Sequence, residues 1–105
     1  PKVIFSKNKK LLYMSRSPIP GSKKNKFNKS FRQICAYVFP RKKLLKFKRN
    51  EKTNFEMIED IEILRFLELD VDVQMIQVTP TPIAVDTQQD LEKARRLMSD
   101  GFVSK

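Results

Sequence analysis

The sequence contains no histidine and no tryptophan, and it has only one cysteine and two glycines among its 105 residues. Histidine is the commonest general base and the commonest zinc ligand, so its absence excludes Ser-His and Cys-His catalysis and most zinc sites. The single Cys35 cannot form an internal disulfide, and its place in an apolar run indicates a structural thiol in a reducing compartment. Any chemistry must therefore use carboxylates, cations or groups supplied by a partner.

Long hydrophobic runs are also missing from the sequence. The longest, Ile34 to Phe39, has six residues, far fewer than the roughly 20 needed to span a bilayer. No signal-peptide pattern is present, so we expect a soluble, cytoplasmic protein without a membrane partner. The length fits one unit over residues 1–105 with a modest core. The chain opens with proline and runs directly into a strand-like segment, which suggests a piece of a longer protein.

Acidic residues are almost absent from the first half of the chain. Residues 1–52 contain 17 Lys and Arg against one acidic residue, whereas residues 53–105 contain five against 11. This segregation predicts either two surfaces that face each other or a cationic surface for an anionic partner. The second reading includes a module that binds nucleic acid by phosphate contacts and base stacking. Its residues would be Lys23, Lys24, Lys26, Phe27, Lys29 and Phe31, but no recognised nucleic-acid motif accompanies them.

The spacing of apolar residues predicts an α/β protein. The expected strands cover residues 2–5, 11–14, 31–39, 71–78 and 83–85, and the expected helices cover about 41–49, 54–69 and 87–98. A turn is expected at 6–10, a loop at 22–30 and an extended connector at 79–82, where prolines and lysines interrupt the pattern. Thr53 or Asn54 is expected to cap the second helix, with Glu56 in its first turn.

The segment from Ile83 to Glu92 predicts the end of a buried strand, an aspartate at the strand tip and a capped helix. Thr87 and Asp90 have capping-box spacing, so each side chain can accept a hydrogen bond from the other residue's backbone N–H. Asp86 then either opens the helix, since aspartate is a preferred cap, or remains available to a ligand. Open α/β sheets bind ligands outside the carboxyl ends of their strands, and hard divalent cations prefer oxygen ligands.

Four motifs occur in one order along the chain. They are Tyr13–Pro20 (YMSRSPIP), Arg32–Tyr37 (RQICAY), Glu56–Arg65 (EMIEDIEILR) and Val85–Glu92 (VDTQQDLE). Together they resemble the carboxyl-terminal half of the 3-deoxy-manno-octulosonate cytidylyltransferases, or CMP-Kdo synthetases. The resemblance covers nearly the whole chain, from about residue 2 to residue 98.

This resemblance implies a three-layer α/β fold with a mixed sheet, of the nucleotide-diphospho-sugar transferase type. It also implies an enzyme of lipopolysaccharide biosynthesis that joins CTP to a 3-deoxy-octulosonate-type sugar acid with Mg²⁺ and releases pyrophosphate. By position, Asp86 matches a magnesium ligand of the family. The positions that match its sugar site or active-site surroundings are Arg16, Gln33, Tyr37 and Glu62. The resemblance also implies a homodimer, with the Ser-Pro-Ile-Pro region contributing to the interface between its two subunits.

Two departures from the family pattern bear on the substrate and on activity. Gln33 stands where the family usually has histidine, and Ile63 stands where it usually has glutamine. Both positions face the sugar in the family, so the acceptor could be a related sugar acid. The amino-terminal half of the family, with its CTP-binding loop, has no counterpart here, so we expect the 105-residue chain alone to be inactive.

Each site residue also has a structural interpretation that does not involve a ligand. Tyr37 would be a core residue with its hydroxyl at the edge, Glu62 would belong to a solvated acidic helix face, and Arg16 would be a surface arginine. A third function is assembly, because half of a domain exposes apolar surface that its missing part would cover.

Overall fold

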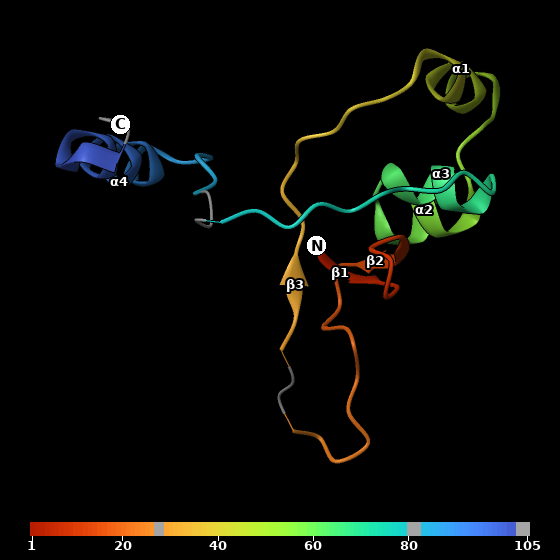
Figure 1. The fold of residues 1–105 in the computed structure, drawn as a ribbon, viewed down its shortest axis with the longest axis horizontal. Coiled ribbons are helices and arrows are strands. Elements are labelled where there is room, and N and C mark those ends of the chain that lie inside the picture. Colours follow the sequence, from red (N-terminus) through yellow and green to blue (C-terminus); the bar gives the residue numbers. More distant parts are fainter. Residues whose placement is uncertain (27–28, 80–82, 103–105) are drawn as a thin grey trace.

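The computed structural model describes residues 1–26, 29–79 and 83–102, and Figure 1 shows their arrangement. The strands are β1 (Lys2–Phe5), β2 (Leu11–Ser15) and β3 (Phe31–Arg32). The helices are α1 (Arg41–Arg49), α2 (Asn54–Glu59), α3 (Ile63–Glu68) and α4 (Gln88–Leu97), followed by the π-helical turn η1 (Met98–Phe102). This mixture confirms the α/β class, and no helix among the described residues is long and apolar enough to cross a membrane.

The three strands form one antiparallel sheet with β1 in the middle. Val3 of β1 lies opposite Met14 of β2 on one side and opposite Phe31 of β3 on the other. The predicted turn at 6–10 is confirmed, because the Ser6 backbone N–H donates to the Lys10 carbonyl over 2.8 Å. The family resemblance implied a three-layer fold with a mixed sheet. The described strands form only this small antiparallel sheet, so the three layers and the mixed sheet stay predictions.

The predicted single helix over 54–69 is wrong, because the chain breaks it at Asp60. Asp60 adopts a left-handed backbone conformation with φ 53° and ψ 49°, which single residues such as aspartate tolerate. The break separates α2 from α3. The expected cap is confirmed at Thr53, whose backbone N–H donates to Glu56 Oε2 over 3.0 Å.

The core lies between the sheet and α3. Its buried apolar residues are Val3, Leu11, Met14, Ile61, Ile63, Leu64, Phe66 and Val71. Met14 and Leu64 are the largest side chains that are completely buried. Five of these residues follow the break at Asp60, and the break turns the chain so that α3 packs on β2.

A buried ion pair joins α1, α2 and α3, which together with the sheet form the main body of the molecule. Arg65 on α3 donates from Nε to Glu56 Oε2 over 2.7 Å and from a terminal nitrogen to Oε1 over 2.6 Å. Its other terminal nitrogen donates to the carbonyl oxygens of Phe47 and Asn50, each over 3.2 Å. The guanidinium also lies 3.8 Å from the centre of the Phe47 ring, a favourable cation–π contact.

Two of the predicted strands are largely absent. The stretch 31–39 forms a strand only over Phe31–Arg32, and the stretch 71–78 forms a single bridge between Gln74 and Lys10. Ile83–Val85 is also not a strand. Val38 is 97% exposed and Ile76 is 82% exposed. Strand-forming residues cannot form a ladder without a neighbour to supply hydrogen bonds, and here these neighbours are missing.

Helix α4 lies apart from the main body at the end of an extended segment (Figure 1). The predicted capping box is confirmed, because Asp90 N–H donates to Thr87 Oγ1 over 3.1 Å and Thr87 N–H donates to Asp90 Oδ2 over 3.0 Å. The predicted stop near Gly101 is replaced by η1, which continues the helix as a wider turn. The connector residues 80–82 lie outside the described part of the chain.

Candidate substrate-binding site

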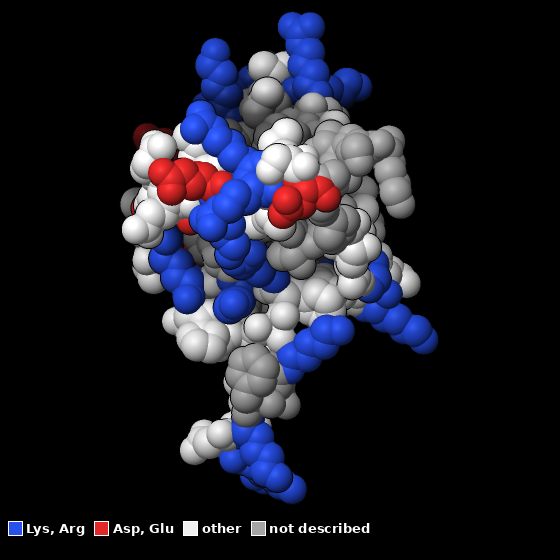
Figure 2. Space-filling model, turned by 90° about the vertical axis from the view of Figure 1, so that its left-hand side faces the viewer, with Lys and Arg blue, Asp and Glu red and all other residues white. Residues whose placement is uncertain are grey.

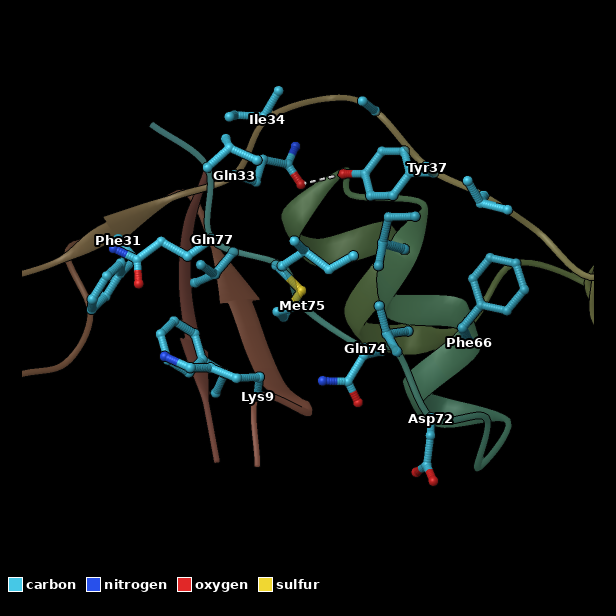
Figure 3. Close-up of a pocket in the computed structure, with 18 of the residues that line it drawn as sticks. Lys9, Phe31, Gln33, Ile34, Tyr37, Phe66, Asp72, Gln74, Met75 and Gln77 are labelled. Carbon is cyan, nitrogen blue, oxygen red and sulfur yellow. Dashed lines mark hydrogen bonds between the residues drawn. The ribbon is translucent and has the colours of Figure 1, made fainter. Parts of the chain in front are cut away.

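A groove of about 1000 Å³ lies beside the main sheet. The segments 33–40 and 71–79 form its two sides, and residues of β1 and α3 form its floor. Figure 3 shows Gln33, Ile34 and Tyr37 along one side, and Gln74, Met75 and Gln77 along the other. This groove brings two predicted site residues, Gln33 and Tyr37, together.

Gln33 and Tyr37 contact each other at the edge of the groove (Figure 3). The Tyr37 hydroxyl donates to Gln33 Oε1 over 2.5 Å, and Gln33 Nε2 lies 3.5 Å from Cys35 Sγ. Tyr37 is 38% exposed, so it is a rim residue and not a core residue. The Tyr37 ring stacks on Phe39, which in turn stacks on buried Phe66 with ring centres 5.4 Å apart.

The chemistry of this pair suits a polar ligand. Partial burial raises the pKa of the Tyr37 hydroxyl, and the nearby Cys35 raises it further by a smaller amount. The hydroxyl therefore stays protonated at neutral pH. The Gln33 amide nitrogen makes only a long contact to sulfur. The Gln33 amide nitrogen can donate to a sugar hydroxyl or carboxylate, and the Tyr37 oxygen, whose proton is donated to Gln33, can accept from a sugar hydroxyl.

Arg16 lies at the junction of β2 with α2. Its Nε donates to the Glu59 carbonyl over 2.5 Å and its terminal nitrogen donates to the Asp60 carbonyl over 2.9 Å. The same nitrogen lies 3.6 Å from Asp60 Oδ2. The Arg16 side chain is 59% exposed, so Arg16 is a surface arginine whose bonds hold the guanidinium against the end of a helix.

Glu59 fixes the junction of β2 with α2, and it does not line the groove. Its carboxylate accepts hydrogen bonds from Ser15 Oγ over 2.5 Å, from Tyr13 Oη over 3.2 Å and from the Arg16 backbone N–H over 2.9 Å. The bonds from Ser15 and Arg16, which outweigh the opposing effect of burial, lower the pKa of Glu59. The only sign of these bonds in the sequence was Ser15 and Arg16 directly after the strand predicted over residues 11–14.

Glu62 lies at the amino end of α3 and is exposed. It makes no hydrogen bond or ion pair with the described residues, and it follows Asp60, which contacts Arg16, by two positions. The structure shows no contact between Glu62 and Arg16, and neither residue lines the groove. Ile63, the neighbouring departure from the family pattern, is 7% exposed and belongs to the core, although it also lines the groove floor.

The structure does not bring Asp86 to the other predicted site residues. Asp86 precedes α4 and is exposed, and α4 lies away from the groove (Figure 1). Its backbone N–H donates to Asp90 Oδ2 over 3.3 Å, while its carboxylate has no hydrogen-bond or ion-pair partner in residues 1–26, 29–79 and 83–102. Because Thr87 and Asp90 cap the helix, the Asp86 carboxylate is left available.

The donor set around Asp86 fits a magnesium ion only in part. Nowhere in the described stretches do three or more His, Cys, Asp or Glu side chains gather to hold a metal. Proteins commonly bind Mg²⁺ with one or two carboxylates and leave the other positions to water and substrate phosphates. Asp86 has the right chemistry for one such ligand, and the remaining ligands must come from elsewhere.

Basic side chains are spread over the surface and do not form a stacking platform. Figure 2 shows Lys and Arg at the top, across the front and at the lower tip of one face, with acidic groups between them. Phe31, one of the two proposed stacking residues, packs edge-on against Phe5 with ring centres 4.9 Å apart and carries the Lys29 ammonium over its ring. Phe27 lies outside the described residues. The local packing of Phe31 leaves little room for a stacked base.

Comparison with known proteins identifies relatives along almost the whole chain. The chain is 36% identical over 99 residues to the 3-deoxy-manno-octulosonate cytidylyltransferase of Christiangramia forsetii, covering 93% of this chain and 40% of that protein. It is 35% identical over 100 residues to the enzyme of the same name from Flavobacterium johnsoniae, covering 94% and 41%. No protein-family model matches the sequence.

A solved structure agrees with these relatives. The chain superposes with a TM-score of 0.85 and 29% identity on CMP:2-keto-3-deoxy-manno-octonic acid synthetase complexed with CTP, covering 94% of this chain and 41% of that one. The chain thus spans about two fifths of the length of the proteins it matches. In sequence and in fold, it is related over nearly all its length to the carboxyl-terminal part of the 3-deoxy-manno-octulosonate cytidylyltransferases.

Proposed function

We propose that this chain is the sugar-binding part of a cytidylyltransferase that converts CTP and a 3-deoxy-octulosonate-type sugar acid to a CMP-sugar and pyrophosphate. The observation that carries the proposal is the superposition, over 94% of the chain, on a synthetase complexed with CTP. The groove with its Gln33 and Tyr37 rim supports it, because this is the described concave surface with polar groups suited to a sugar acid.

In the proposed reaction, a hydroxyl oxygen of the sugar acid forms a bond to the α-phosphorus of CTP, and the bond from that phosphorus to the pyrophosphate oxygen breaks. The hydroxyl proton leaves to solvent. Gln33 and Tyr37 would orient the acceptor by hydrogen bonds at the groove rim. Such positioning is a large part of enzymatic rate enhancement. Arg16 does not line the groove, so it would reach the acceptor only if the site of the complete protein extends to the helix junction.

Asp86 is proposed to contribute one carboxylate oxygen to a magnesium ion. When bound, the metal supplies charge neutralisation at the phosphates and lowers the pKa of the attacking hydroxyl. For this the segment from 83 onwards must lie near the groove in the complete protein. The exposed, unpaired carboxylate is compatible with that role.

Fusion of the missing part tests the proposal. We expect the 105-residue chain alone to release no pyrophosphate from CTP and the sugar acid. We expect the same chain, fused behind the uncovered amino-terminal part of the Christiangramia forsetii relative, to release it only when CTP, sugar acid and Mg²⁺ are all present. Equal release with and without the sugar acid would reject the proposed acceptor role.

The hydroxyl of Tyr37 provides a narrower test in the fused protein. Tyr37→Phe removes one hydrogen bond while keeping the stack on Phe39, so we expect KM for the sugar acid to rise about tenfold, the effect of about 1.4 kcal/mol. The KM for CTP should stay within twofold. Tyr13→Phe, which removes a hydroxyl bonded to Glu59 at 3.2 Å and outside the groove, is the control. If both variants changed the sugar KM equally, Tyr37 would have no sugar-specific role.

A further inference from the structure

We infer that helix α1 is a contact surface for an anionic lipid bilayer, with its leucines at the level of the headgroups and its cationic side chains against the lipid phosphates. The inference does not rest on the proposed function, because Lys43 is the only residue of α1 that lines the groove. The expectation of no membrane partner came from the lack of a spanning segment, and a helix that lies on a bilayer does not need one.

Most of the positive charge in the first half of the chain is not neutralised by the second half. Residues 1–52 contain 17 Lys and Arg. Within the described stretches, only Lys10 and Arg16 of these form ion pairs, with Asp72 and Asp60. The sequence left open two surfaces that face each other or a cationic surface for an anionic partner, and the structure favours the second.

The charge is densest on α1, where six of nine residues are basic and none is acidic. All six are exposed, and none forms an ion pair with another described residue. Lys46 donates to the Leu69 carbonyl over 2.8 Å, and Lys43 lines the groove. The side chains that remain for an external partner are Arg41, Lys42, Lys48 and Arg49. Basic clusters of this size on an amphipathic helix are typical of anionic-lipid binding.

The leucines of α1 lie between these cations. Leu44 and Leu45 follow Arg41 by three and four positions and precede Lys48 by four and three, so the four residues share one side of the helix. Leu44 is 46% exposed, and of the apolar residues of α1 only Phe47 packs against the core. Helices that lie on membranes place leucines among the headgroups, while long cationic side chains reach the phosphates.

The same features favour a bilayer over a nucleic acid. Nucleic-acid phosphates would also attract the cations, but they offer no apolar region for the leucines, and single strands bind best where aromatic rings are free to stack. The only aromatic ring of α1 is Phe47, which stacks on Phe66 with ring centres 4.9 Å apart and lies 3.8 Å from the Arg65 guanidinium. Figure 1 shows α1 at an outer corner of the molecule, away from β3 and α4, where a flat surface can reach it.

Sedimentation with lipid vesicles tests the inference on the 105-residue chain. The vesicles contain phosphatidylcholine alone or phosphatidylcholine with about 30% phosphatidylglycerol, which is anionic. The test variant combines Lys42→Gln, Lys48→Gln and Arg49→Gln. The matched control combines Lys7→Gln, Lys23→Gln and Lys24→Gln, which removes the same charge from exposed positions outside α1. A third variant, Leu44→Gln, removes apolar surface and keeps every charge.

We expect the native chain to bind the anionic vesicles and not the neutral ones, and to bind less tightly as salt rises to about 0.5 M. The α1 triple variant should bind about 100-fold more weakly, because each cation near the surface contributes to adsorption, and the control triple variant should bind much more tightly than it. Leu44→Gln should weaken vesicle binding by about threefold or more and leave binding to single-stranded DNA unchanged.

Three results would overturn the inference: no binding to anionic vesicles at low salt, equal weakening by the two triple variants, or tighter binding to single-stranded DNA than to the vesicles. Circular dichroism spectra that match the native chain show that the variants are folded. The outcome is separate from the proposed function, because vesicle binding by a fused protein that releases no pyrophosphate would still support the lipid surface.

Discussion

Replacing Asp86 by asparagine is expected to lower CTP-dependent pyrophosphate release by the fused protein at least 100-fold. Asparagine keeps the shape of the side chain but loses the negative charge, and a metal ligand contributes several kcal/mol to the stabilisation of phosphate charge. Thr87 and Asp90 cap α4 without the Asp86 side chain. The loss should therefore appear in turnover and not in folding.

The matched control is Glu92→Gln on the same helix. Glu92 is exposed, and its replacement removes one negative charge from the same segment without touching the cap. We expect its turnover to stay within twofold, and we expect higher Mg²⁺ concentrations to restore part of the activity of Asp86→Asn only. Unimpaired turnover by Asp86→Asn would reject the metal assignment.

The second large effect is expected from the buried ion pair. Glu56→Gln removes the charge that compensates Arg65, and breaking such a pair costs about 3–5 kcal/mol because the remaining charge stays buried. Domains are stable by only about 5–15 kcal/mol, so this variant should be largely unfolded or melt far below the native chain. Circular dichroism during heating measures the difference.

Acid unfolding gives the same pair a second readout. The hydrogen bond from Arg65, against the opposing effect of burial, lowers the pKa of Glu56. A carboxyl group whose pKa is lower in the folded state stabilises that state fully above its unfolded pKa, and this contribution is lost as the pH falls through the lower folded value. The native chain should lose stability below about pH 4, and Glu56→Gln should lack this part of the pH dependence.

Two further variants separate charge from packing. Glu51→Gln removes an exposed charge near the start of α2 and should melt like the native chain. The double variant Glu56→Leu with Arg65→Met replaces the pair by apolar groups, which often restores stability, although the Phe47 and Asn50 carbonyls lose a donor. Equal melting of Glu56→Gln and Glu51→Gln would show that the pair does not hold the helices together.

Local sequence signals predicted the elements whose stabilising contacts lie within a few residues. The hairpin of β1 and β2, helix α1, the Thr53 cap and the capping box of Thr87 and Asp90 all follow from spacing or turn chemistry that operates over short distances. All of these elements are stabilised by contacts between residues close in the sequence. Their agreement with the structure therefore says little about the missing part.

The elements that sequence reasoning missed depend on distant contacts. The break at Asp60 accompanies the bonds of Glu59 and Asp60 to Arg16, more than 40 positions earlier, and no helical periodicity reports such a contact. Glu56 and Arg65 are nine positions apart, so their pairing appears only after the helices fold back. Segments 31–39 and 71–78 were predicted as strands because their residues favour strands, but a strand needs a neighbour.

The candidate site was predicted only in part, because the sequence does not report contacts between distant segments. Gln33 and Tyr37 lie four residues apart and meet in the structure, whereas Arg16 contacts Glu59 and Asp60 and not the predicted site residue Glu62. The structure favours one of the two alternatives left open for Asp86, because Thr87 and Asp90 cap α4 without its carboxylate. Its segment lies away from the groove in the structure (Figure 1), which no local sequence pattern reports.

The identity of the reaction product tests the central claim most directly. Phosphorus NMR of the fused protein with CTP, a 3-deoxy-octulosonate-type sugar acid and Mg²⁺ should show one phosphodiester signal of a CMP-sugar for each pyrophosphate released. Formation of free CMP at the same rate with and without the sugar acid would contradict the account, because the chain would then provide no acceptor site.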